Sequence, residues 1–213
     1  MNLHWMTPNE RSIALYRRHA AGYDASAART MVLRRRVIGL LALQPGEVVL
    51  DVGAGTGLSY EPLLQAVGPA GRVLAFEQSP EMFDRAAERV ARQGWANVWH
   101  VQASAEAVQL PAAPDALLFN YVHDITRTPE ALANLVRQAR PGARIAVCGM
   151  KFFPWWTGPL NLLAWAKNRP YNARAAELWQ PWSLLEPLCS DWQRTSIHAG
   201  MGYIAWGRLK GRP

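Results

Sequence analysis

A short apolar segment that runs directly into a glycine-rich turn constrains the fold of this chain more than any other feature. Residues 47–51 (Glu-Val-Val-Leu-Asp) are predicted to form a buried strand, because apolar residues dominate the segment and Pro45-Gly46 stops the helical pattern before it. Residues 52–58 then read Val-Gly-Ala-Gly-Thr-Gly-Leu. Glycines at such a turn let a ligand lie against bare backbone near the N-terminus of the next helix. The segment therefore predicts a ligand-binding turn at the end of a buried strand.

Strand and helix patterns alternate on both sides of this turn. Strands are predicted at 47–51, 72–77, 98–101, 116–120 and 144–148, and helices at 30–43, 59–67, 79–93 and 129–139. Such alternation is typical of βαβ units, in which helices cover both faces of a parallel sheet. Two last strands, at 193–198 and 203–209, predict an antiparallel hairpin at one edge. The predicted fold class is α/β, with a seven-stranded, mostly parallel sheet.

The order of the glycines separates two kinds of nucleotide-binding turn. Dinucleotide sites use Gly-x-Gly-x-x-Gly, but here Gly57 comes one residue early and Leu58 takes the expected place. NAD and FAD are therefore disfavoured. Gly-x-Gly-x-Gly after an acidic strand end resembles instead the S-adenosylmethionine-binding turn of the class I methyltransferases. The resemblance covers roughly residues 30–150 and implies a Rossmann-like fold with S-adenosylmethionine as cofactor.

The resemblance also assigns the positions that would hold the cofactor. Glu77 ends the second predicted strand, where the family places the acid that accepts the ribose hydroxyls, and Asp51 resembles the acid near the methionine end. Residues 103–105 read Ala-Ser-Ala where the family usually has Gly-Asp-Ala, so Ser104 replaces a carboxylate beside adenine. The implied cofactor-binding residues are Tyr23, Asp51, Gly53, Ala54, Gly55, Gly57, Glu77, Gln78, Met82, Ala103, Ser104, Ala105, Asn120 and Tyr121.

The acceptor side of the site is expected to come from three separate segments. Residues 16–24 resemble the segment that folds over the cofactor in quinone C-methylases, glycine-type N-methylases and bacterial lipid N-methylases. His123 follows the fourth strand and is the candidate base or orienting group, with Tyr16, Tyr23 and Tyr171 as hydroxyl partners. Tyr16, His123, Trp156 and Tyr171 are the predicted substrate-binding residues. A hydrogen-bonded histidine that only supports the site is an equally good interpretation of His123.

The chain is divided into four parts of a single domain, 1–213. Residues 1–29 are predicted to form an N-terminal helical cap, 30–150 the cofactor-binding core, and 193–213 the C-terminal hairpin. Between them, 151–192 carries Trp155, Trp156, Trp165, Trp179 and Trp182 among several prolines, and is predicted to form a lid and wall over the acceptor. Rings that simply fill the core of a helical cap are the alternative.

Charge and cysteine content restrict the partners. The formal net charge is +7, with seven arginines in residues 11–36, which suits an anionic membrane surface, an acidic substrate or simply a solvated helical face. No segment has the length of apolar residues that a spanning helix needs. The two cysteines and scattered histidines fit no metal site, so none is predicted, and a reducing cytoplasmic location is expected.

Several functions remain open at the level of sequence. The leading hypothesis is transfer of a methyl group to an amine nitrogen of a small molecule or lipid, at the inner face of the membrane if the acceptor is a lipid. C- or O-methylation of an aromatic or quinone-like metabolite is the alternative. RNA methylation is disfavoured, because 120–123 (Asn-Tyr-Val-His) is a poor substitute for an Asn-Pro-Pro-Tyr motif. A cofactor-binding protein without catalysis also fits, and the oligomeric state is open.

Overall fold

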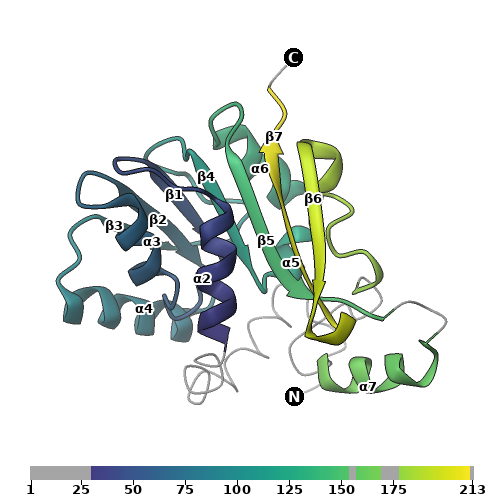
Figure 1. Cartoon of the computed structure of the whole chain (residues 1–213). Coiled ribbons are helices and arrows are strands. Elements are labelled where there is room, and N and C mark those ends of the chain that lie inside the picture. Colours follow the sequence, from purple (N-terminus) through teal and green to yellow (C-terminus); the bar gives the residue numbers. More distant parts are fainter. Residues whose placement is uncertain (1–29, 154–156, 169–177, 212–213) are drawn as a thin grey trace.

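A computed structural model describes residues 30–153, 157–168 and 178–211 of the chain. Its centre is a seven-stranded sheet in the order β3-β2-β1-β4-β5-β7-β6 (Figure 1). The strands are β1 (Val48–Val52), β2 (Arg72–Glu77), β3 (Val98–Gln102), β4 (Ala116–Asn120), β5 (Arg144–Met150), β6 (Cys189–Ile197) and β7 (Gly202–Leu209). The first five are parallel, and β7 pairs antiparallel with both β5 and β6. The predicted α/β fold is therefore confirmed.

The helices cover the two faces of the sheet because side chains alternate along each strand. One face packs on α2 (Met31–Leu40), α3 (Tyr60–Val67) and α4 (Pro80–Gln93). The other packs on α6 (Pro129–Gln138) and on residues 182–188, with the short α5 (His123–Thr126) at its edge. Within β1, Val49 contributes to the first core and Leu50 to the second. The two cores pack on the faces of the sheet. The edge formed by the carboxyl ends of the parallel strands is therefore free to form a site.

The hairpin begins earlier than its sequence pattern indicates. β6 starts at Cys189 rather than 193, and its register with β7 shifts between Ser190 and Gln193. Asp191 has a positive φ of 51° at this bulge, which breaks the alternation that marks a strand. The predicted boundary between the Trp-rich cap and the hairpin, at 192/193, therefore falls inside a strand.

Two helices lie in segments where no helix was predicted. α5 has only four residues, and α7 (Pro159–Asn168) occupies part of the segment predicted to form the Trp-rich cap. The predicted N-terminal cap, residues 1–29, lies outside the described residues. Among the described helices, none combines the length and hydropathy that crossing a bilayer requires.

Candidate functional site

The glycine turn after β1 has three glycines in the left-handed region of backbone space. Their φ angles are 59° at Gly53, 59° at Gly55 and 75° at Gly57. A Cβ at Gly53 would lie 2.8 Å from Val122 Cγ1, and one at Gly57 would lie 2.6 Å from the ring of Tyr60. A Cβ at Gly55 would meet nothing within 4 Å. Gly53 and Gly57 are therefore needed for packing, whereas Gly55 faces open space where a ligand can approach the backbone.

Glu77, at the end of β2, is the residue that holds this turn in place. Its Oε2 accepts a hydrogen bond from the Gly55 N–H at 2.9 Å, and its Oε1 accepts one from the Ser79 N–H at 2.8 Å. Burial raises the pKa of Glu77, and the backbone N–H groups of Ser79, Gly55 and Gln78 oppose that rise. Each carboxylate oxygen keeps a second lone pair, so Glu77 can orient the turn and still accept a hydroxyl donor.

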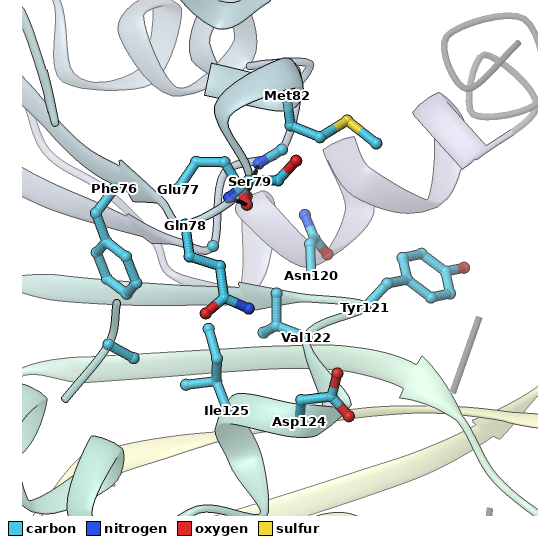
Figure 2. Close-up of a pocket in the computed structure, with 13 residues that line it drawn as sticks. Phe76, Glu77, Gln78, Ser79, Met82, Asn120, Tyr121, Val122, Asp124 and Ile125 are labelled. Atoms are coloured by element: carbon cyan, nitrogen blue, oxygen red, sulfur yellow. Dashed lines mark hydrogen bonds between the residues drawn. The ribbon is translucent and has the colours of Figure 1, made fainter. Parts of the chain in front are cut away.

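A cleft opens at the carboxyl ends of β1, β2 and β4 and contains about 630 Å³ of space, part of it open to solvent. Figure 2 shows Phe76 at one end of the cleft and Tyr121 and Asp124 at the other. Eight of the predicted cofactor residues line it: Gly53, Gly55, Glu77, Gln78, Met82, Ala105, Asn120 and Tyr121. Five lining residues were not predicted: Phe76, Ser79, Val122, Asp124 and Ile125.

The charged side chains that line the cleft, among the described residues, all carry the same sign. Among the described residues, the charged side chains that line the cleft are the carboxylates of Glu77 and Asp124. Phe76, Val122 and Ile125 add apolar surface to the lining. A cationic or hydrogen-bond-donating ligand with an apolar ring fits such a lining better than an anion does.

The side-chain amide of Asn120 lines the cleft and has no hydrogen-bond partner among the described residues. It ends β4 and is buried, yet neither its Oδ1 nor its Nδ2 has a hydrogen-bond partner among the described residues. Because an unpaired buried amide costs about 1–3 kcal/mol, such a group is expected to pair with a ligand or water. The next residue, Tyr121, holds a φ of 58°, which turns the chain sharply from β4 toward α5.

A second polar cluster lies behind the turn, on the face covered by α2 and α3. Asp51, Arg34 and Ser59 are all buried, and Arg34 Nη1 donates to Ser59 Oγ at 3.1 Å. Burial raises the pKa of Asp51 to about 7, although the Arg34 guanidinium and the Ser59 hydroxyl favour the ionised form. Asp51 Oδ2 has no hydrogen-bond partner among the described residues. Asp51 does not line the cleft itself, so it is placed to act on the turn from behind.

This carboxyl is expected to make stability depend on pH. An acid whose pKa is near 7 when folded and 3.8 when unfolded keeps its proton in the folded state, so stability falls as pH rises from about 4 to about 7. Asp51→Asn should remove this loss, which amounts to roughly 4 kcal/mol or less. Urea unfolding of both proteins at pH 5 and pH 7.5 measures it. Equal changes with pH in the two proteins would contradict the assignment.

The remaining predicted residues fall into three groups: residues near the cleft, His123, and residues outside the described part of the chain. Ala54, Gly57, Ala103 and Ser104 lie near the cleft without lining it; the carbonyl of Ser104 accepts hydrogen bonds from Ala107 and Val108. His123 also does not line the cleft, and its Nε2 accepts the Met150 N–H at 3.1 Å. Burial lowers the pKa of His123 to about 4, so the ring is neutral near pH 7 and its acceptor nitrogen is occupied. Tyr16, Tyr23, Trp156 and Tyr171 lie outside the described residues.

Most of the lining residues that were not predicted lie where the chain turns after β4. Val122, Asp124 and Ile125 flank or belong to α5, and Val122 and Ile125 pack over Gly53. Phe76 precedes Glu77 on β2 and is buried against the second core. The signal that could have found Phe76 is its place next to the predicted acid at a strand end, where ligands of parallel sheets bind.

Known proteins resemble this chain in its central part. Residues 49–142 match the model of a methyltransferase domain family. A protein-L-isoaspartate O-methyltransferase from Aeropyrum pernix is 36% identical over 136 residues, 63% of this chain and 48% of that protein. A ubiquinone/menaquinone biosynthesis C-methyltransferase from Ectopseudomonas mendocina is 30% identical over 146 residues, 65% of this chain and 57% of that protein. The chain thus spans about half the length of these curated relatives.

The fold is also shared with a solved structure. A SAM-dependent methyltransferase from Aquifex aeolicus superimposes with a TM-score of 0.63 at 22% identity, covering 83% of this chain and 89% of that one. The sequence match begins in β1 and includes the glycine turn, Glu77 and the end of β4, which are the parts that build the cleft. Residues 49–142 thus match a methyltransferase domain family, and the fold is shared with a SAM-dependent methyltransferase of known structure.

Proposed function

We propose that this protein transfers a methyl group from S-adenosylmethionine to an amine nitrogen of a small-molecule or lipid acceptor. The observation that supports the amine is the lining of the cleft, whose charged side chains among the described residues are both carboxylates. An amine presents hydrogen-bond donors and a positive charge to Asp124, and the bound cofactor carries its own positive charge. Acceptors with phosphate or carboxylate groups at the reacting end would be repelled.

The residues of the cleft fit the cofactor. Gly55 offers bare backbone, Glu77 offers carboxylate lone pairs suited to vicinal hydroxyls, and the buried amide of Asn120 lacks a protein partner among the described residues. Phe76, Ala105 and Ile125 supply the apolar surface that an adenine ring needs. Bound there, S-adenosylmethionine supplies a methyl group on a positively charged sulfur. We place Asp51, Gly53, Gln78, Met82 and Tyr121 in the same cofactor site.

The chain's own contribution to the reaction is alignment. An in-line displacement requires the acceptor nitrogen behind the methyl carbon, and well-held geometry can lower the barrier by roughly 7–11 kcal/mol. The nitrogen must be neutral when it reacts, so an acceptor that binds as an ammonium gives up one proton before the N–C bond forms. Asp124 lines the cleft and is the group we assign to orient the amine and accept its proton. His123, neutral with Nε2 occupied by Met150, orients the backbone of β5.

Asp124→Asn is expected to raise the KM for an amine acceptor or lower kcat by about tenfold or more, because a charged acceptor of hydrogen bonds is lost. Affinity for S-adenosylhomocysteine should stay within about threefold, because the carboxylate of Glu77 still holds the turn. Steady-state kinetics and calorimetry measure the two effects. Glu130→Gln, an exposed carboxylate at the start of α6, is the matched control and should change neither.

The proposed activity is tested by the release of S-adenosylhomocysteine from a panel of acceptors. The panel pairs amines with phenolic and quinone-like compounds of similar size, together with RNA. Turnover with amines supports the proposal. Turnover confined to another class identifies that class instead, and cofactor binding without turnover on any acceptor would show a protein that binds but does not catalyse.

A second candidate is C- or O-methylation of an aromatic or quinone-like acceptor. It is favoured by the relative from Ectopseudomonas mendocina, whose name states ubiquinone/menaquinone biosynthesis C-methylation. The apolar residues Val122 and Ile125 and the phenol of Tyr121 could face such a ring. For either acceptor we propose a cytoplasmic protein, and for a lipid acceptor one that works at the inner face of the membrane.

A further inference from the structure

Exposed apolar side chains are concentrated in one segment of the molecule. Five large hydrophobic residues are exposed in the described part of the chain, and four of them lie between 160 and 179. Their exposed fractions are 47% for Leu160, 68% for Leu162, 38% for Trp165 and 46% for Trp179. The fifth, Val32 on α2, stands apart at 81%. Such a concentration is unusual on a soluble surface and marks a contact with an apolar partner.

Helix α7 carries three of these exposed residues, Leu160, Leu162 and Trp165. Its sequence is Pro-Leu-Asn-Leu-Leu-Ala-Trp-Ala-Lys-Asn, in which the polar residues are Asn161, Lys167 and Asn168. Leu160 and Leu162 are two residues apart, so they project from nearly opposite sides of the helix, and both are exposed. A helix that is apolar on all sides is stable when it is buried in a core or in a membrane environment. The described part of the protein buries neither side of α7 fully.

The segment is attached to the end of the C-terminal hairpin. Asn161 Nδ2 donates to the Phe153 carbonyl at 3.2 Å, and the Lys151 N–H donates to the Met201 carbonyl at 2.8 Å. Trp179 packs edge-on against Phe152 with ring centroids 5.1 Å apart. Figure 1 shows α7 beyond the carboxyl end of β5, at the edge of the sheet where the cleft opens. A surface that covers α7 would therefore lie at the same end of the sheet as the cleft.

The charge of the sequence around α7 selects the partner. Residues 151–179 contain four basic residues, Lys151, Lys167, Arg169 and Arg174, and one acidic residue, Glu177. Two copies that met through this segment would bring like charges together, whereas an anionic lipid surface attracts them. Tryptophan also prefers the headgroup layer of a bilayer. A segment that combines apolar residues, indoles and an excess of basic over acidic residues has the composition of an interfacial membrane segment.

We propose that α7 and Trp179 form a docking surface for an anionic lipid bilayer and that the acceptor enters the cleft from that surface. The exposure and charge of this segment support docking. Entry of the acceptor from the docked surface also rests on the proposed methyl transfer. The chemistry that this surface recognises is a negatively charged lipid headgroup layer over hydrocarbon.

The test is flotation with phosphatidylglycerol-containing vesicles, without cofactor, so that failure of docking and failure of methyl transfer are separate results. The protein is expected to float with these vesicles at low salt and less at high salt. Leu162→Glu should reduce the bound fraction about tenfold or more, because an apolar contact is lost and a negative charge is added. Val32→Glu adds the same charge at an apolar residue on α2 that is more exposed than Leu162, and it should float like the wild type.

Two further measurements keep the interpretation unambiguous. Leu162→Glu should bind S-adenosylhomocysteine as the wild type does, which shows that the variant is folded. Sedimentation without lipid tests self-association through the same surface. A wild-type protein that does not float, equal losses in Leu162→Glu and Val32→Glu, or a concentration-dependent dimer that Leu162→Glu abolishes would each overturn the proposal.

Discussion

Gly55→Val is expected to abolish the binding of S-adenosylhomocysteine in calorimetry. Gly55 lines the cleft with a φ of 59°, and a Cβ built on it projects into open space rather than into the protein. A branched side chain there would occupy the space in which the cofactor must approach the backbone. Valine also resists the left-handed conformation, so the free energy of unfolding should fall by about 1–3 kcal/mol. Binding is therefore lost both through occupied space and through a strained turn.

Gly94→Val separates these two causes. Gly94 ends α4 with a φ of 64° and also has nothing within 4 Å of an added Cβ, but it lies outside the cleft. The backbone strain is thus matched and the steric block is absent. Gly94→Val should lose similar stability in urea and keep its affinity. Normal binding by Gly55→Val, or equal loss of binding by both variants, would show that the turn does not contact the cofactor.

Glu77→Ala should weaken the binding of S-adenosylhomocysteine by about 1.5–3 kcal/mol, roughly 10- to 150-fold. Two contributions act together. The ribose hydroxyls lose a charged acceptor, and the N–H groups of Gly55 and Ser79 lose the carboxylate that holds them in place. The second contribution leaves a looser turn, and ordering that turn on binding should make the entropy of binding less favourable.

Glu77→Gln provides the intermediate case. The amide keeps one acceptor oxygen, but its NH2 group meets one of the two backbone N–H donors, so its affinity should lie between those of the wild type and Glu77→Ala. Glu88→Ala, which removes an exposed carboxylate from α4, is the control for charge and should bind normally. Unchanged affinity in Glu77→Ala would remove Glu77 from the site.

The sequence predicts those parts of the molecule that depend on local patterns. The strand before the glycine turn, the acid at the end of β2 and the order of five parallel strands follow from periodicity and turn residues. α5 could not be predicted, because four residues are too short for a helical period to appear. Asp124 was missed for the same reason, since its position in the cleft depends on the sharp turn at Tyr121.

Contacts between distant residues explain the other differences. His123 was a candidate base because its ordinary pKa suits proton transfer, but Met150 is 27 residues away and occupies Nε2 through its N–H. Likewise, the bulge at Asp191 breaks the alternating pattern of β6, so the strand seems to begin later than it does. Neither the Met150 donor nor the bulge at Asp191 can be recognised from the amino-acid sequence alone.

The two hydrogen bonds from Gly55 and Ser79 to Glu77 join residues of the chain itself, so they form when the chain folds and fix the shape of the turn. The conformational entropy of this turn is lost once, when the chain folds, and not again at each round of binding. Replacing spent S-adenosylhomocysteine with fresh S-adenosylmethionine then requires no rebuilding of the turn. The rate of that exchange then depends on how the ligand enters and leaves the cleft, which separates the control of turnover from the control of affinity.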